Sequence, residues 1–179
     1  MDETRSRGTT FSALLRLAVV AAVFLACTAY AVIAFSAQDS VWFLAGFEER
    51  PSRVIVYGDG RRTEFAPGQL GFDELAEAVR DSLNAGVARQ SGIGLSAGSL
   101  QDAYTRYVSV EAFFDKPVKL HAAFSTGYPN QMLFPVTGRH SDLPIVFLGV
   151  DGQYLSNGPV LNTIEPIRKA LQGRDFDLK

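Results

Sequence analysis

Cysteine is nearly absent from this chain of 179 residues, and the single one that occurs, Cys27, lies inside a long apolar run. The rest of the chain therefore has no disulfide, no cysteine metal site and no thiol nucleophile. It must fold on its hydrophobic core. A domain of about 130 residues can do so, because domains above roughly 60 residues commonly fold unaided.

Clusters of basic residues are also missing. The chain has 17 Lys and Arg against 19 Asp and Glu, for a net charge of -2, and the two signs are interspersed. Without a basic stripe, nucleic acid is not an expected partner. A nucleotide is not expected either. The phosphate-binding loop needs a Lys after its last glycine, and here Ser99 follows Gly98.

Residues that could act in catalysis or bind a metal ion are few and scattered along the sequence. His121 and His140 are far apart in the sequence, whereas a zinc site needs about three protein ligands. Residues 94–98 match the G-x-S-x-G pattern, in which the serine sits between a strand and a helix. Residues 87–92 are too polar and glycine-broken for that strand, so a serine hydrolase using Ser96 is the least favoured alternative. We predict no catalytic, cofactor-binding or metal-binding residue.

The apolar run covers residues 17–34 and reads LAVVAAVFLACTAYAVIA, with no charge, proline or glycine. It extends over residues 11–37 at the expense of one charge, Arg16. About 20 apolar residues cross a bilayer as a helix, and a helix satisfies its own backbone in lipid. We therefore predict a transmembrane helix at 11–37 that acts as a signal anchor, with membrane lipid around it. A cleaved signal peptide is the alternative, although its apolar region is normally about 7–15 residues long.

Charges beside this segment predict its orientation. Arg5, Arg7 and Arg16 lie before or at its start, whereas Asp39 follows it. Because positive charge in short loops stays cytoplasmic, residues 1–10 are a predicted cytoplasmic tail and the remainder is extracytoplasmic. Such a tail is too short for an output domain. A composition rich in arginine, alanine and glycine favours the membrane of a bacterial cell.

Aromatic residues mark two places where a partner is expected to bind. Residues 38–52 are a predicted juxtamembrane connector, and its aromatic residues suit the outer membrane interface. An adjacent pair of phenylalanines falls in a predicted strand, where neighbours point to opposite faces. Either both faces of the sheet are covered or one ring is exposed. The candidate partner contacts are Trp42, Phe43, Phe47, Phe113 and Phe114.

The remaining sequence predicts one extracytoplasmic domain at residues 53–173, followed by a polar tail at 174–179. Its clearest helix is 72–83, whose apolar residues recur at helical spacing. The other predicted elements are a hairpin at 53–65, a helix at 99–106, strands at 107–114, 118–124, 131–136 and 144–150, a hairpin turn at 151–152, and a short helix after Thr163. Grouped strands joined by short turns predict an α+β fold with a mainly antiparallel sheet and about three helices.

The predicted function follows from these absences. With no catalytic constellation, no cofactor motif and no output domain, we expect a non-enzymatic, membrane-anchored accessory or assembly subunit of a bacterial envelope or membrane protein complex. Its partner would be another membrane protein. The alternative is an extracytoplasmic ligand-binding or sensing domain that acts through a partner and uses a pocket between the sheet and helix 72–83.

Overall fold

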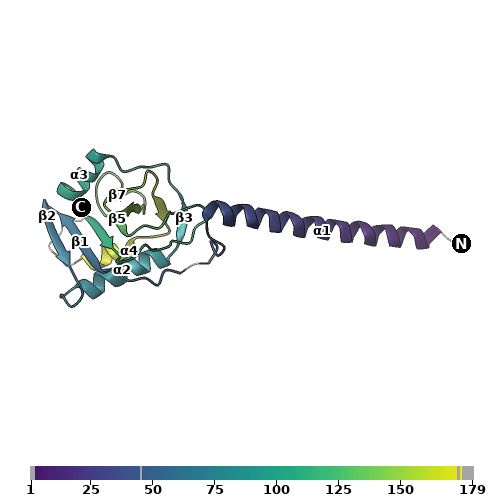
Figure 1. Ribbon diagram of the computed structural model, residues 1–179, viewed down its shortest axis with the longest axis horizontal. Helices are drawn as coiled ribbons and strands as arrows, with labels where there is room; N and C mark the ends of the chain where they lie inside the picture. The colour runs from purple at the N-terminus through teal and green to yellow at the C-terminus, as the bar shows by residue number, and fades with distance from the viewer. Residues whose placement is uncertain (1–2, 45, 173, 175–179) are drawn as a thin grey trace.

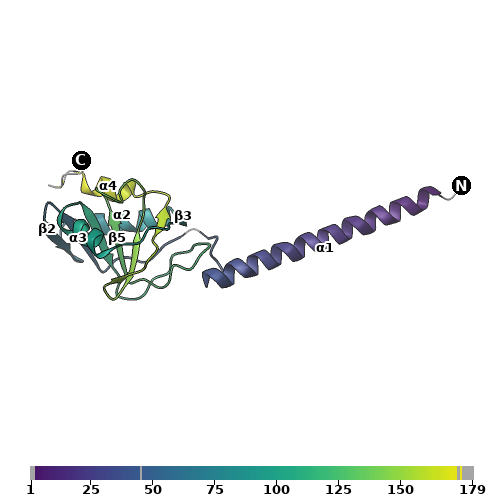
Figure 2. The ribbon, with the colours of Figure 1, turned by 90° about the horizontal axis from the view of Figure 1, so that it is seen from above.

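The computed structural model describes residues 3–44, 46–172 and 174, and shows one long helix attached to a folded domain (Figure 1 and Figure 2). The elements, in chain order, are α1 (Glu3–Ala37), β1 (Arg53–Gly58), β2 (Arg61–Phe65), α2 (Phe72–Asn84), β3 (Val87–Gln90), α3 (Ala97–Thr105), β4 (Ser109–Phe113), β5 (Gln131–Pro135), β6 (Phe147–Val150), β7 (Gln153–Tyr154), β8 (Pro159–Leu161) and α4 (Glu165–Leu171). The fold is α+β, as predicted.

Helix α1 contains a segment, Phe11–Ala37, of 27 residues that is long and apolar enough to cross a membrane. Its side chains are exposed along nearly all of this length, so no part of the folded domain covers them. The helix ends where Gln38 adopts a left-handed φ of 55°. There the Asp39 N–H donates to the Ala34 carbonyl at 3.0 Å, in the pattern of a Schellman C-cap.

The main sheet is antiparallel throughout, with the strand order β2-β1-β4-β5-β6-β7. Two of its hairpins have two-residue turns, and both turns place their residues at positive φ: Asp59 and Gly60 in one, Asp151 and Gly152 in the other. An Asp-Gly pair is favoured in such turns because their twist matches that of the strands. Both turns were predicted from the sequence, and both are confirmed.

One face of the sheet is covered by α2 and α4, and it carries the larger core (Figure 1). The predicted stripe on α2, which includes Phe72, Leu75 and Val79, is buried against it. The opposite face is covered by α3 and the segment before it, around a smaller core that includes Leu133 and Phe147. Both faces of the sheet are therefore packed against other elements, and of the adjacent phenylalanines Phe114 is buried whereas Phe113 stays partly exposed.

Two predicted segments differ from the structure. Residues 87–90 do form a strand, β3, because they pair with β8 in a second, two-stranded sheet and leave their polar side chains partly or fully exposed. Residues 118–124 form no strand. Val118, Leu120 and Ala122 still alternate inward as a strand would, but Lys119 and His121 turn toward Asp39. The segment is held by the junction with α1, by the burial of Val118 and Leu120 in the larger core, and by the hydrogen bond from the Val118 N–H to the Pro129 carbonyl at 2.8 Å.

Candidate functional site

The place where α1 meets the folded domain is built around one buried carboxylate, that of Asp39, which is 3% exposed. Its Oδ2 lies 2.6 Å from His121 Nδ1, and its Oδ1 lies 3.3 Å from Lys119 Nζ and accepts from the Val41 N–H at 3.0 Å. Lys119 Nζ also donates to the Gln38 carbonyl at 3.2 Å. The chain just after the helix is thus fixed to residues 119–121, which lie far along the sequence.

Electrostatics favour a charged Asp39. Burial opposes its ionisation, but the hydrogen bond from His121, with those from its other two partners, outweighs burial and lowers the pKa of this carboxyl below its usual value. The stabilisation that results is present above the pKa of the unfolded chain, about 3.9, and is lost as the pH falls below that value. At physiological pH the carboxylate is therefore charged and holds the junction.

The three connector aromatics lie in different environments. Phe43 is 58% exposed, Trp42 is half-buried, and their rings meet edge to face at 5.8 Å. Phe47 is 2% exposed and packs edge to face on Phe114 at 5.7 Å. Its N–H also bonds to the Asn84 side chain. Phe47 therefore anchors the connector in the core, and its burial does not favour the predicted partner contact, whereas Trp42 and Phe43 are accessible to a partner.

The adjacent phenylalanines of the sheet are also unlike each other. Phe114 is 6% exposed and belongs to the larger core, which does not favour the predicted partner contact at this ring. Phe113 is partly exposed on the opposite face, and the Arg53 guanidinium carbon lies 4.1 Å from its ring centroid. It borders an open depression with Asn130, Gln131 and Asp151.

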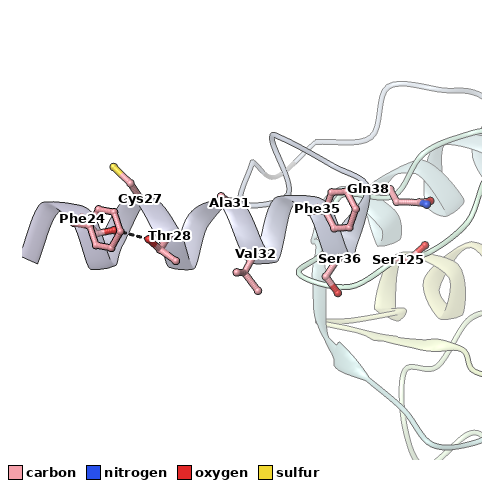
Figure 3. Close-up of a pocket in the computed structure, with 9 residues that line it drawn as sticks. All are labelled: Phe24, Cys27, Thr28, Ala31, Val32, Phe35, Ser36, Gln38 and Ser125. Atoms are coloured by element: carbon pink, nitrogen blue, oxygen red, sulfur yellow. Dashed lines mark hydrogen bonds between the residues drawn. The ribbon is translucent and has the colours of Figure 1, made fainter.

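A second hollow lies along α1 itself (Figure 3). Phe24, Thr28 and Phe35 line one side of the helix, and Ser125 of the domain closes the end near Phe35. The Thr28 hydroxyl donates to the Phe24 carbonyl at 2.8 Å, so its polar group is satisfied within the helix. A surface of this kind suits lipid chains or another helix and offers no chemistry to a polar ligand.

Glu111 forms the most polar cluster inside the domain. This carboxylate is 1% exposed on β4, and it accepts hydrogen bonds from Tyr57 at 2.7 Å and Tyr104 at 2.9 Å, and also from Tyr154 and Gln131. Burial, with the carboxylate beside the hydroxyl, raises the pKa of Tyr57 to about 12 and also raises the pKa of Tyr104 and Tyr154. These hydroxyls stay protonated and keep donating. The cluster therefore holds α3, β1 and β7 against β4, which is a structural role.

Ser96 is the N-cap of α3. Its Oγ accepts from the Ser99 N–H at 3.1 Å and bonds to the Ser99 hydroxyl at 3.0 Å. No hydrogen bond joins it to a histidine in the described part of the chain. His140 packs instead on Phe147 at 5.3 Å, and burial lowers the pKa of its ring. Helix capping accounts for the position of Ser96, and α3 begins at Ala97, two residues before the start predicted from the sequence.

Within residues 3–44, 46–172 and 174, no group of three or more His, Cys, Asp or Glu side chains is placed to hold a metal ion. Comparison of the chain with known protein families, with curated proteins and with solved structures found no match. The junction at Asp39 and the surfaces beside it are therefore judged on their own geometry.

Sequence reasoning missed the junction. In the sequence, Asp39 is recognisable only as a charge beside the membrane span, and His121 falls in the strand predicted at 118–124. The alternation of Lys119 and His121 with apolar neighbours did signal two basic side chains on one side of the segment. The acidic partner on that side is some 80 residues earlier in the chain, as the separation of 82 between His121 and Asp39 shows, and no local pattern identifies it.

Proposed function

We propose that this protein is a non-enzymatic, membrane-anchored accessory subunit of a bacterial envelope or membrane protein complex. The observation that carries the proposal is the junction at Asp39, which fixes the folded domain to the end of α1. A domain that needs only to stay near a membrane can hang on a flexible linker. A fixed junction instead gives helix and domain one shared surface, and such a surface suits assembly with another membrane protein.

The residue composition of α1 next to the junction supports the proposal. The helix side drawn in Figure 3 combines small residues, Cys27, Thr28 and Ala31, with the larger Phe24 and Phe35. Small residues let the backbones of two membrane helices approach closely, and large ones fill the space beside them. Because the junction fixes α1 against the domain, a partner helix on this side would also meet the loop at Ser125.

The orientation proposed for the protein places the folded domain outside the cytoplasm. Arg5, Arg7 and Arg16 at the N-terminal side of α1 support it, with Asp39 and Glu48 on the other side. A periplasmic reporter fused after Lys179 should be active, and a reporter that works only in the cytoplasm should be silent at the same position. The opposite pattern would reverse the orientation and remove the envelope from the proposal.

The junction provides the test of the proposed function. Asp39→Ala removes the carboxylate that Lys119 and His121 share, and it leaves the main core untouched. Affinity capture of the tagged full chain from mildly solubilised native membranes should recover a membrane-protein partner. The yield of that partner should fall several-fold for the variant, because helix and domain no longer present one fixed surface.

Asp73→Ala is the matched control, since Asp73 forms an ion pair with Arg50 on the exposed surface of the same domain. An exposed pair contributes at most about 1 kcal/mol, so this variant should recover the partner like the unmodified chain. Equal yields from the Asp39 and Asp73 variants would show that the junction has no part in assembly.

A ligand-binding or sensing domain is the second candidate. An open depression supports it. The depression is bordered by a positive group, Arg53, a negative group, Asp151, and the side-chain amides of Asn130 and Gln131. The pocket expected between the sheet and α2 does not support it, since Phe72 and Leu75 fill that space with core side chains. A ligand bound in the depression would touch Gln131, and through it Glu111 and the tyrosine cluster.

A further inference from the structure

The connector after α1 does not continue away from the helix but folds back beside it. Its backbone passes Tyr30, whose hydroxyl donates to the Ser40 carbonyl at 2.6 Å. The ring of Tyr30 also meets the ring of Phe43 edge to face, at 6.4 Å between centroids. In Figure 3 the connector reaches back along the helix to about the level of Ala31. We call residues 40–44 the apolar turn.

The apolar turn lies alongside the part of α1 where a membrane surface must fall. The 27 residues of the segment Phe11–Ala37 make a helix about 40 Å long. This exceeds the hydrocarbon core of roughly 30 Å, so the last turns of the helix reach the boundary between acyl chains and headgroups. Tyr30 lies about 10 Å before Ala37 along the axis. The turn is therefore at the depth of that boundary and not above it.

The composition of the turn suits this depth. Val41, Phe43 and Leu44 are 37%, 58% and 51% exposed, so three apolar side chains in a row of four face outward. Leu70 also faces outward, at 98% exposure, but it is a single residue in the turn between β2 and α2. Exposed apolar side chains are stabilised when they are removed from water. Because this run is continuous with a membrane-spanning segment, the bilayer that surrounds the segment is the nearest apolar medium.

The backbone of the turn is also prepared for an apolar environment. Four of its backbone polar groups are engaged within the protein: the Ser40 carbonyl by Tyr30, the Val41 N–H by the Asp39 carboxylate at 3.0 Å, and the Leu44 N–H and Val41 carbonyl by each other at 2.8 Å. A backbone polar group without a partner is costly in the hydrocarbon core, so these bonds suit a position at its boundary.

From these four observations we propose that the apolar turn inserts into the leaflet beneath the folded domain, with Phe43 and Leu44 among the acyl chains next to the headgroups. Its occupant is lipid. The turn fixes how deep α1 sits and holds the domain against the membrane surface. The inference rests on α1 spanning a membrane and requires no partner protein, although a partner bound over the apolar turn would contradict it.

The depth of Phe43 can be measured with fluorescence, because Trp42 is the single tryptophan of the sequence. A full chain carrying Trp42→Phe and Phe43→Trp would be reconstituted in phosphatidylcholine–phosphatidylglycerol vesicles. Lipids brominated on the acyl chain near the headgroup should quench most of its emission, and iodide in the buffer should quench little. The control carries Trp42→Phe and Leu70→Trp, and the quenchers should act on it in the reverse order.

Strong quenching by iodide and weak quenching by the brominated lipid at position 43 would place the turn in water and overturn the proposal. Weak quenching by both would mean that protein covers the turn, either a second copy or another chain, and would overturn it as well. The unmodified chain gives a second measurement that needs no substitution. Its Trp42 emission should be quenched by the same brominated lipid more than the emission of the Leu70→Trp control.

Discussion

Replacing Glu111 with alanine should lower the free energy of unfolding of the domain by about 3–5 kcal/mol, because several buried donors lose the acceptor that they share. The substitution would leave the hydroxyls of Tyr57, Tyr104 and Tyr154 and the amide of Gln131 inside the protein without their shared acceptor. Each buried donor left unpaired costs about 1–3 kcal/mol. Since small domains are stable by only about 5–15 kcal/mol, the loss is a large share of the total.

Urea unfolding of the full chain in detergent micelles would measure this loss. Glu64→Ala is the matched control, because Glu64 is an exposed carboxylate on β2 with Arg53 and Arg62 beside it. Its removal should cost no more than about 1 kcal/mol. A change of less than about 1 kcal/mol for Glu111→Ala would mean that the tyrosine cluster does not hold α3 and β7 against the sheet.

The adjacent phenylalanines should respond very differently to a negative charge. Phe114→Glu should unfold the domain, because it places an unpaired carboxylate in the larger core next to Phe47, and an isolated buried charge is very costly. The expected loss exceeds the roughly 3–5 kcal/mol typical of truncating a buried phenylalanine to alanine. Phe113→Glu should leave the domain folded, because residue 113 is partly exposed and Arg53 lies against it.

Circular dichroism of both variants at increasing temperature would separate these outcomes, with the unmodified chain as reference. A folded Phe114→Glu variant would contradict the core position of that ring. The Phe113→Glu variant, once shown to be folded, also reports on the proposed partner. If Phe113 is a contact, the variant should lose the partner in affinity capture while its circular dichroism stays unchanged.

Local patterns were sufficient for much of the fold. The helical spacing of Phe72, Leu75 and Val79 predicted α2 and the face it buries, and the two Asp-Gly turns predicted their hairpins. These features depend on residues within one element or one turn, so the sequence contains the whole signal. The apolar segment at 11–37 was likewise recognisable from length and composition.

Features that depend on distant residues could not be predicted in the same way. Strand β3 forms because β8, some 70 residues later, pairs with it, although its own residues are polar. Residues 118–124 have the alternation of a strand, yet Asp39 takes up their two basic side chains. The burial of Phe47 likewise depends on its contact with Phe114, and the sequence of the connector alone does not predict that contact. Most of the candidate site also depends on distant residues, because it joins the helix end to a segment far along the chain.

The native mass of the unmodified chain, extracted from its own membranes in a mild detergent, tests the accessory-subunit proposal most directly. The proposal predicts a particle clearly heavier than one 19.5 kDa chain in its micelle, containing a second membrane protein in a fixed ratio. A particle with the mass of a single chain, recovered under conditions that keep other membrane complexes intact, would contradict it.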